Sequence, residues 1–535
     1  MRRIFVYFCL ALVLFTIASA FFFPAALWSW LVFGPLVCLG IYDSLQVKHS
    51  ITRNFPVLGH FRFLFELIRP EIYQYFVESD TDGVPFDRDE RSLVYQRAKD
   101  VRDTVPFGTK ENVYRTGYEW INHSMSPVHN VPEDMRVNIG GTNCSQPYSA
   151  SLLNISAMSY GSLSKNAVVS LSKGASIGNF AHNTGEGGIS PYHIEGGGDL
   201  IWQIGTGYFG CRNSKGGFDE SLFRETSSQA QVKMIELKLS QGAKPGHGGI
   251  LPAAKLTPEI AKIRNVPLGK DVISPPGHCE FSTPIGLLEF MVKLRENSGG
   301  KPVGFKLCVG KRREFLAVCK AMVQTGITPD FITVDGGEGG TGAAPLEFSN
   351  HIGAPLVEGL IFVHNALVGY DVRDQIKVIA AGKVTSGFAL LKRLALGADA
   401  CYSARGMMLA LGCIQALKCN SNHCPVGVAT TNPGLMAGLV PSHKSVRVAS
   451  YHHETIKSLA EMLGAVGLDD PSDLRPWHVL HRTSSVETKH YGELYDFLDP
   501  GELLREPLPA AYRRACNAAS ADAFTHVETD MAPTS

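Results

Sequence analysis

The sequence lacks an excess of charge of either sign, since 50 lysines and arginines balance 50 aspartates and glutamates. No overall field draws the chain to nucleic acid, and nucleic-acid binding is not expected. Cysteine is also scarce, with 12 residues in a chain of 535. That number is too low for a disulfide framework and indicates a reducing compartment.

Charged residues are absent from two apolar runs near the N-terminus, residues 4–23 and 24–41. Each run is close to the roughly 20 residues that a membrane-spanning helix needs. Arg3 precedes the pair and Lys48 follows it, so the positive-inside rule predicts a membrane hairpin with both ends in the cytoplasm. The alternative is a secretory signal peptide, cleaved after the small residues 18–20.

A G-x-G-x-x-G motif is missing after the first predicted strand, which disfavours an open dinucleotide-binding sheet. From about Leu152, short β-branched runs alternate with amphipathic helical segments. Eight such runs in about 260 residues predict an α/β fold, a TIM (β/α)8 barrel, with an open doubly wound sheet as the alternative. The predicted strands are LLNISA, IGNFAHN, VKMIELKL, DVIS, PVGFKLCV, FITVDG, IKVIAAG and ACYSA.

The chain is predicted to have five parts. The transmembrane hairpin, 1–43, is followed by a helical collar, 44–140, then the barrel with its cysteine segment, 141–438, a helical segment, 439–507, and a flexible tail, 508–535. The collar contains the amphipathic run FRFLFELIRPEIYQYFVE, which we expect to pack on the barrel. A membrane-surface helix is the alternative, disfavoured by the mixed charges of the run.

Two loops after the last predicted strands indicate a phosphate site. Phosphate commonly binds after strands seven and eight of a barrel, and here the loops are AAGKVTSG and SARG. Both offer glycine backbone beside a cation, Lys383 or Arg405, and both lead into a helix N-terminus that favours an anion. A phosphate-bearing cofactor is predicted, although either loop alone could be an ordinary connection.

The loop GGEGGTGAAP, residues 336–345, has five glycines in ten residues and would let backbone amides reach a flat ring or an oxyanion. Lys306, in the strand GFKLCV, is predicted to point into the barrel. The anionic edge of a reduced flavin is one partner for such a buried lysine. A structural pair with Asp335 or Glu338 is the other.

Three cysteines, Cys413, Cys419 and Cys424, lie within twelve residues directly after the second phosphate loop. Their spacing is not the short C-x-x-C of structural zinc, and a single zinc ion would need a fourth ligand such as His423. Three thiolates in one compact segment can instead hold an iron–sulfur cluster with three irons.

Five motifs together resemble the synthase domain of glutamate synthases, and most of all the stand-alone FMN-binding form that carries an N-terminal membrane hairpin. The similarity covers roughly residues 44–480. It implies an FMN-bearing TIM barrel with a 3Fe-4S cluster beside the flavin, held by the three cysteines. The motifs are AMSYGSLS, LSQGAKPGHGGILP, ISPPGHCEFS, GGEGGTGAAP and GCIQALKCNSNHCPVGVAT.

The same resemblance implies residue roles. Glu186 matches an acidic residue near the flavin, and Lys244 and Arg264 match cations that hold the carboxylates of 2-oxoglutarate, as a dicarboxylate requires. His247 could donate a proton to the imine nitrogen, or could be a loop histidine without a catalytic part. The implied cofactor-binding residues are Met158, Ser159, Tyr160, Gln203, Lys306, Gly339, Gly340, Thr341, Gly342, Gly382, Lys383, Ser403, Arg405 and Gly406.

The sequence departs from the family pattern at three points. His247 and Ile250 stand where an acid and an amide are usual, and Trp202 stands where a lysine precedes the flavin glutamine. Ile250 cannot replace the hydrogen bond of that amide, which puts the substrate in question. The chain begins with an apolar segment in place of a glutaminase domain, so we expect its ammonia to come from elsewhere.

These features predict a glutamate synthase-type oxidoreductase on the inner membrane, with its catalytic domain in the cytoplasm. The expected substrates are 2-oxoglutarate, or a related oxo acid, and ammonia. The expected electron donor is a ferredoxin or a flavoprotein subunit. One alternative keeps FMN and the cluster but acts on another amine or oxo acid. The other is a membrane-bound electron-transfer module with no substrate of its own.

Overall fold

The computed structural model describes residues 2–101 and 104–525, which form two compact units, 1–88 and 89–535. The first unit is entirely helical. Two of its helical spans, Arg3–Phe22 and Pro24–Leu45, are long and apolar enough to cross a membrane, a property that anchors share with signal sequences. Its elements are α1 (Arg2–Phe22), η1 (Pro24–Ser29), α2 (Trp30–Leu45), α3 (Ser50–Asn54), α4 (Gly59–Ile72) and η2 (Tyr73–Val77).

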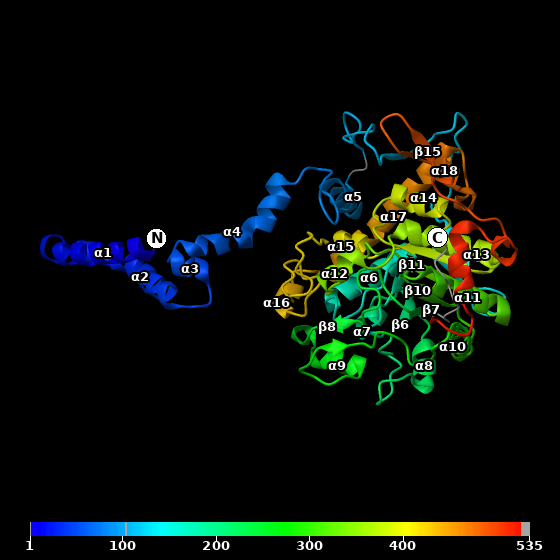
Figure 1. The fold of residues 1–535 in the computed structure, drawn as a ribbon, viewed down its shortest axis with the longest axis horizontal. Helices are drawn as coiled ribbons and strands as arrows, with labels where there is room; N and C mark the ends of the chain where they lie inside the picture. Colours follow the sequence, from blue (N-terminus) through cyan, green and yellow to red (C-terminus); the bar gives the residue numbers. More distant parts are fainter. Residues whose placement is uncertain (1, 102–103, 526–535) are drawn as a thin grey trace, which may run out of the picture. The chain divides into compact units, whose positions relative to one another are not determined.

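The second unit is built around a closed barrel of eight parallel strands, which confirms the predicted TIM barrel. Figure 1 shows β6, β7, β10 and β11 at the centre of this unit, with α8, α10, α11 and α13 outside them. The last strand pairs with the first, so the sheet has no free edge. In order around the barrel the strands are β4 (Leu153–Ile155), β5 (Ala181–Asn183), β6 (Asp199–Ile204), β7 (Val232–Lys238), β10 (Val303–Leu307), β11 (Phe331–Asp335), β12 (Lys377–Ala381) and β13 (Ala400–Ser403).

Seven of the eight predicted runs contain barrel strands, and one prediction was wrong. DVIS holds β9 (Val272–Ile273), which pairs with β8 (Ile250–Leu251) in a separate two-stranded sheet. The barrel strand that the prediction missed is β6, in the run DLIWQI. A short apolar run does not reveal by periodicity alone which sheet it joins.

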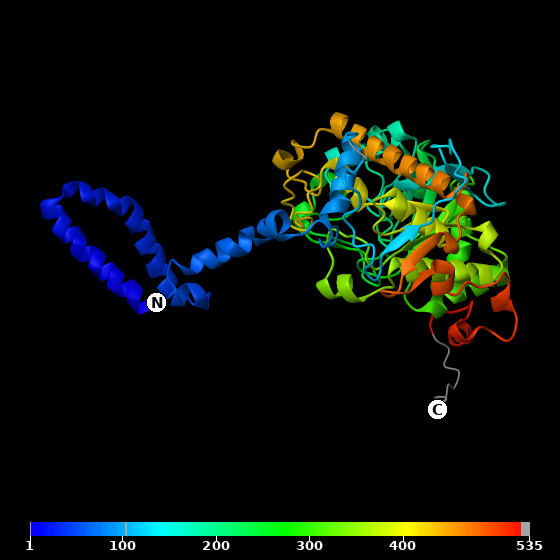
Figure 2. The same cartoon turned by 90° about the horizontal axis from the view of Figure 1, so that it is seen from above.

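Helices cover the barrel between successive strands, as Figure 2 shows from above. The connection after β7 is the longest, since β8, η3 (Ala253–Lys255), α9 (Pro258–Arg264) and β9 precede α10. The other covering helices are α6 (Lys165–Gly178), α7 (Pro191–Glu195), α8 (Glu220–Ser227), α10 (Pro284–Asn297), α11 (Arg312–Thr325), α12 (Leu346–His351), α13 (Leu356–Gly369), α14 (Gly387–Ala395) and α15 (Arg405–Leu411).

A β-hairpin closes the N-terminal end of the barrel. Its strands, β2 (Arg136–Ile139) and β3 (Tyr148–Ser151), pair antiparallel. Ile139, Tyr148 and Ala150 pack in one buried cluster with side chains from the barrel strands, among them Phe331 and Tyr402. Any ligand of the barrel must therefore enter from the opposite end, where the strands finish.

Segments outside the barrel complete the second unit. The long helix α17 packs on α6, and the stacked rings of His452 and Phe180, with centroids 3.9 Å apart, join the two regions. The segment from 508 to 525, expected to be flexible, forms α19, which buries Tyr512 and Cys516; the rest of that expected tail lies outside the described residues. The remaining elements are α5 (Arg88–Lys99), β1 (Glu119–Ile121), α16 (Pro433–Met436), α17 (Pro441–Val466), β14 (Val479–Arg482), β15 (Thr488–His490), α18 (Tyr491–Leu494) and α19 (Ala510–Asn517), with short η5 (Pro471–Asp473), η6 (Pro476–His478) and η7 (Glu502–Leu504) turns.

Candidate active site

Loops at the carboxyl ends of the strands bring four charged side chains together. Glu186 follows β5, Lys238 ends β7, Lys244 lies in the loop after β7, and Arg264 ends α9. Lys238 Nζ lies 2.8 Å from Glu186 Oε1. The charges of Lys244 and Arg264 also act on Glu186. Three cations thus surround one carboxylate, which leaves the cluster with excess positive charge.

Glu186 is held in its ionised form. Burial by itself would raise the pKa of its carboxyl, but the neighbouring Lys238, Lys244 and Arg264 lower that pKa below its usual value. Gly205 and Gly249 lie close on two sides, because a Cβ at either position would fall 2.5 Å or less from a carboxylate oxygen of Glu186. The carboxylate therefore lies against backbone on two sides, while the Glu186 side chain stays 19% exposed.

Among the described residues, Lys244 and Arg264 are buried cations without an ion pair to a carboxylate. Lys244 is 4% exposed and donates to the carbonyl oxygen of Ala343, and burial together with the charge of Lys238 lowers its pKa to about 8. Arg264 is 5% exposed and donates from Nη2 to the carbonyl oxygen of Tyr160, while its Nε has no hydrogen-bond partner in the described chain. Desolvated cations of this kind favour an anionic ligand.

Sequence analysis missed two members of this site. Lys238 is the last residue of its strand, and its Nζ donates to Gln241 as well as pairing with Glu186. His278 accepts or donates at both ring nitrogens, 2.9 Å from the hydroxyl of Tyr208 and 2.8 Å from the carbonyl oxygen of Lys238. Burial lowers the pKa of His278 to about 4, so the ring is neutral and positions the end of β7.

His247 lies in the same loop as Lys244, and its contacts are with Gly248 and with Phe348 of α12. Nδ1 lies 3.0 Å from the carbonyl oxygen of Gly248, and the ring meets Phe348 edge to face. Within the described residues no hydrogen bond or ion pair joins His247 to Glu186. Trp202 points away from the site, because its ring stacks on Phe223 of α8.

Most of the predicted flavin residues lie in loops at the carboxyl ends of the strands, whereas Gln203 and Lys306 lie within β6 and β10. The glycine-rich loop contacts the loop after β7, since Gln241 Nε2 donates to Thr341 and Lys244 reaches Ala343. Arg405 Nη2 donates to the carbonyl oxygen of Glu338. Ser403 Oγ donates to the carbonyl oxygen of Val384, which joins the loops after β12 and β13. Most of the residues implied by the resemblance are thus brought to one end of the barrel.

Some of these side chains already have protein partners. Lys306 Nζ lies 3.0 Å from Asp335 Oδ2, which is the structural pair named as its alternative partner. Gln203 donates to Glu236, deep in the barrel, where Asn183 and Thr333 donate as well. Tyr160 donates to Glu259, and the hydroxyls of Ser159 and Ser162 are hydrogen-bonded. Met158 is 5% exposed at the end of β4.

The cysteine segment follows α15 at this end of the barrel. Burial raises the pKa of Cys413 to about 11 and that of Cys419 above its usual value. The backbone amide of Gln415 donates to Cys413 Sγ at 3.5 Å. Among residues 2–101 and 104–525, however, no group of three or more His, Cys, Asp or Glu side chains is arranged to hold a metal ion.

Lys255, which sequence analysis did not identify, is a buried cation beside the cysteines. It is 3% exposed, donates to the carbonyl oxygen of Ser162 at 3.1 Å, and has no ion pair with a carboxylate in the described part of the chain. Burial lowers its pKa, whereas Cys419 and Cys424 act in the opposite direction. The side chain of Asn422 donates to the carbonyl oxygen of the neighbouring Ala254, which fixes the cysteine segment against this turn.

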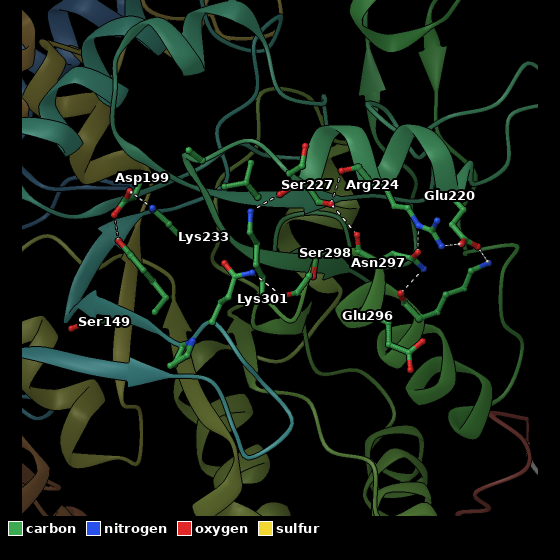
Figure 3. Close-up of a pocket in the computed structure, with 18 of the residues that line it drawn as sticks. Ser149, Asp199, Glu220, Arg224, Ser227, Lys233, Glu296, Asn297, Ser298 and Lys301 are labelled. Atoms are coloured by element: carbon green, nitrogen blue, oxygen red, sulfur yellow. Dashed lines mark hydrogen bonds and ion pairs between the residues drawn. The ribbon is translucent and has the colours of Figure 1, made fainter.

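A cavity of about 1210 Å³ opens elsewhere, at the N-terminal end of the strands. Figure 3 shows its charged side chains contacting one another: Lys233 lies near Asp199, and Arg224 near Glu220. Lys301 Nζ donates to the carbonyl oxygen of Ser227 and so caps the end of α8. This cavity lies at the opposite end of the strands from Glu186 and Lys244, which follow the carboxyl ends of β5 and β7.

Comparison with known proteins agrees with this geometry. Residues 127–469 match the family model described as the conserved region in glutamate synthase. The glutamate synthase large subunit-like protein YerD of Bacillus subtilis is 38% identical over 502 residues, which cover 86% of this chain and 93% of that protein.

More distant matches cover less of their own length or are too weak to use. The archaeal glutamate synthase (NADPH) of Methanocaldococcus jannaschii is 34% identical, and the match spans 60% of each protein. A solved structure of a single-residue variant of mandelate oxidase with 2-hydroxy-phenylacetamide aligns over 80% of this chain and 96% of its own, at 14% identity and a TM-score of 0.41.

Proposed function

Because the chain belongs to the family that carries the conserved region of glutamate synthase, we propose that it is a glutamate synthase-type oxidoreductase. The proposed reaction joins 2-oxoglutarate and ammonia as 2-iminoglutarate and reduces that imine to L-glutamate. The observation that carries the proposal is the cluster of Lys238, Lys244 and Arg264 around the single carboxylate of Glu186. A dicarboxylate supplies the negative charge that this cluster lacks.

Each charged residue has a role that follows from its surroundings. Arg264 and Lys244, both desolvated, would hold the two carboxylates of the oxo acid and keep water away from them. Glu186, ionised at neutral pH, would accept a hydrogen bond from ammonium or from the imino nitrogen. His247 as the proton donor to that nitrogen stays a prediction, supported by its place in the loop of Lys244.

The residues present fit FMN as the redox cofactor. Lys383 and Arg405, on joined loops after β12 and β13, would hold its phosphate, and the loop 339–342 would lie against the ring. When bound, a reduced flavin supplies a hydride for the imine. Lys306 would act on the flavin while paired with Asp335, whose negative charge raises the pKa of the lysine against the effect of burial and keeps it cationic.

A 3Fe-4S cluster held by Cys413, Cys419 and Cys424 is proposed as the electron entry. Support comes from the three thiols within one twelve-residue segment, from the amide that donates to Cys413, and from the buried cation Lys255 near Cys419 and Cys424. An external ferredoxin or flavoprotein subunit would deliver the electrons. We further propose that the apolar hairpin anchors the protein in the inner membrane, with the barrel in the cytoplasm.

A second candidate reaction uses the same apparatus on a less polar oxo acid. Ile250 begins β8, directly after Gly249, which touches the carboxylate of Glu186. A hydrocarbon side chain so near the charged cluster offers no hydrogen bond to a substrate and favours an apolar group there.

One assay separates the two reactions. The protein is reduced without oxygen, 2-oxoglutarate and ¹⁵N-ammonium are added, and flavin reoxidation and labelled glutamate are followed together. We expect both. Reoxidation with another oxo acid and amine, but not with this pair, would assign the second reaction. No reoxidation by any oxo acid and amine would leave an electron-transfer module.

A further inference from the structure

Within the first unit, α4 and η2 expose a continuous apolar surface. Phe61, Leu64, Phe65, Ile72 and Phe76 are between 44% and 84% exposed. They recur at spacings that place them on one side of the helix, with Arg69 and Glu71 at its edges and Arg62 and Glu66 further round. Phe63 and Leu67, 43% and 66% exposed, extend the apolar surface to the opposite side. A face with so many large apolar residues in water marks a contact surface.

The start of α4 is fixed to the end of the hairpin. Asp43, at the end of α2, is 1% exposed and accepts a hydrogen bond of 2.9 Å from the backbone amide of Val57. The same carboxylate lies 2.9 Å from His60 Nε2. Gly40 of α2 packs on Phe5 of α1, so the two ends of the hairpin lie together. The apolar face of α4 therefore begins where the hairpin would leave the membrane.

The charges of this segment suit a phospholipid surface. Residues 46–72 contain four basic and two acidic residues. Arg62 and Glu66 pair on the polar side of α4, at 3.8 Å, so the mixed charges partly neutralise each other and leave net positive charge. Anionic headgroups attract such segments by about 1 kcal/mol per basic residue near the surface.

We propose that α4 and η2 lie in the headgroup region of the membrane, with Phe61, Leu64, Phe65, Ile72 and Phe76 directed toward the acyl chains. This inference rests on the proposed membrane hairpin. The aromatic side chains of the face, with Tyr73 and Tyr75 nearby, are of the kind enriched at membrane interfaces. The face is thus occupied by lipid, in place of the predicted packing of this helix on the barrel.

The test uses the full-length protein in native membranes. A photoreactive p-benzoylphenylalanine replaces Phe61 or Phe65 on the apolar side, and Glu66 on the polar side as the matched control. A fourth variant carries the same probe in place of Leu14, within the hairpin. After irradiation, mass spectrometry identifies what each probe has captured.

We expect phospholipid adducts with the probe at Phe61 or Phe65, and none with the probe at Glu66. The inference would be overturned if the probes at both Phe61 and Phe65 captured peptides of the barrel, a second copy of the chain or another protein. Lipid adducts at Leu14 in the same experiment would still support the membrane hairpin. Absence of lipid adducts at Leu14 as well would overturn the hairpin and the inference together. Placing the probe at two phenylalanines guards against a local disturbance by either one.

Discussion

Lys244 donates a hydrogen bond of 2.8 Å from Nζ to the carbonyl oxygen of Ala343. This bond ties the proposed substrate loop to the glycine-rich loop of the proposed flavin site. Gly242, two residues earlier, lies so close to Gly336 that the loops touch through their backbones. Binding at the two proposed sites should therefore be coupled through this contact between the loops.

Binding of 2-oxoglutarate should weaken as the pH rises through 8. Burial and the charge of Lys238 lower the pKa of Lys244 to about 8, so the ammonium is present below that pH and lost above it. Affinity should then fall by about tenfold per pH unit. Lys244→Arg should remove this dependence, because a guanidinium stays charged. Calorimetric titration between pH 7 and pH 9.5 measures it, and a flat profile for the wild-type protein would contradict the role of Lys244.

Replacing Arg264 with alanine should weaken 2-oxoglutarate binding by about 2–5 kcal/mol, the range for removing one partner of a buried charge pair. The flavin should remain bound through the loops after β12 and β13, to which Arg264 makes no hydrogen bond within the described residues; its hydrogen bond goes to the carbonyl oxygen of Tyr160, and its guanidinium lies over the ring of Phe209. Arg212 provides a matched control, because it also stacks near Phe209 but donates to the carbonyl oxygen of Gly207. Equal losses in Arg264→Ala and Arg212→Ala would argue against direct substrate contact.

Gly242→Ala should loosen both loops. The added Cβ would lie 1.8 Å from the carbonyl oxygen of Gly336, so backbone must move, at a cost of about 1–3 kcal/mol. We expect weaker retention of flavin and of 2-oxoglutarate, measured by flavin content after dialysis and by titration. Gly277→Ala is the control, since its Cβ would meet nothing within 4 Å. Normal flavin content in Gly242→Ala would show that the coupling is not needed.

Cys419→Ser should abolish iron and sulfide while the barrel stays folded, because a three-thiolate site cannot hold a three-iron cluster with two thiolates. Metal analysis and circular dichroism provide the two measurements. Cys279→Ser, at an exposed cysteine, should keep its iron. Zinc in place of iron in the wild-type protein would contradict the cluster assignment itself.

Lys255→Met should lower the reduction potential of the cluster, since the buried ammonium stabilises the more negative, reduced form. A tenfold change in the equilibrium constant corresponds to about 59 mV for one electron. Redox titration followed by electron paramagnetic resonance reads the potential directly. Lys262→Met, on the exposed side of α9, should leave it unchanged. An unaltered potential in Lys255→Met would mean that the cation serves only to fill the core.

Much of the fold could be predicted because alternating strands and helices carry a strong periodic signal. The exception, DVIS in place of DLIWQI, reflects a property that local pattern does not encode, namely which sheet a short strand joins. Glu186, Lys244 and Arg264 were found through family motifs, and the structure brings their loops together.

What the sequence left open depends on pairing across the fold. Lys238 ends a strand in a run with ordinary alternation, and only the closed barrel reveals that it faces Glu186. For a structural pair, Lys306 could have met Asp335 or Glu338, and the tertiary structure pairs it with Asp335. The hydrogen bonds of Asp43, which join α2 to α4, link residues 14 and 17 positions apart and leave no local motif.

The hairpin of β2 and β3 fills the N-terminal end of the barrel with Ile139, Tyr148 and Ala150. Because this end of the barrel is filled, ligands enter and leave the barrel at the other end. Oxo acid and ammonia must arrive, and the amino acid must depart, by the same route, so the product has to clear the passage before the next turnover begins. Glutamate should accordingly compete with 2-oxoglutarate for entry. Its accumulation would then lower the turnover rate without any separate regulatory site.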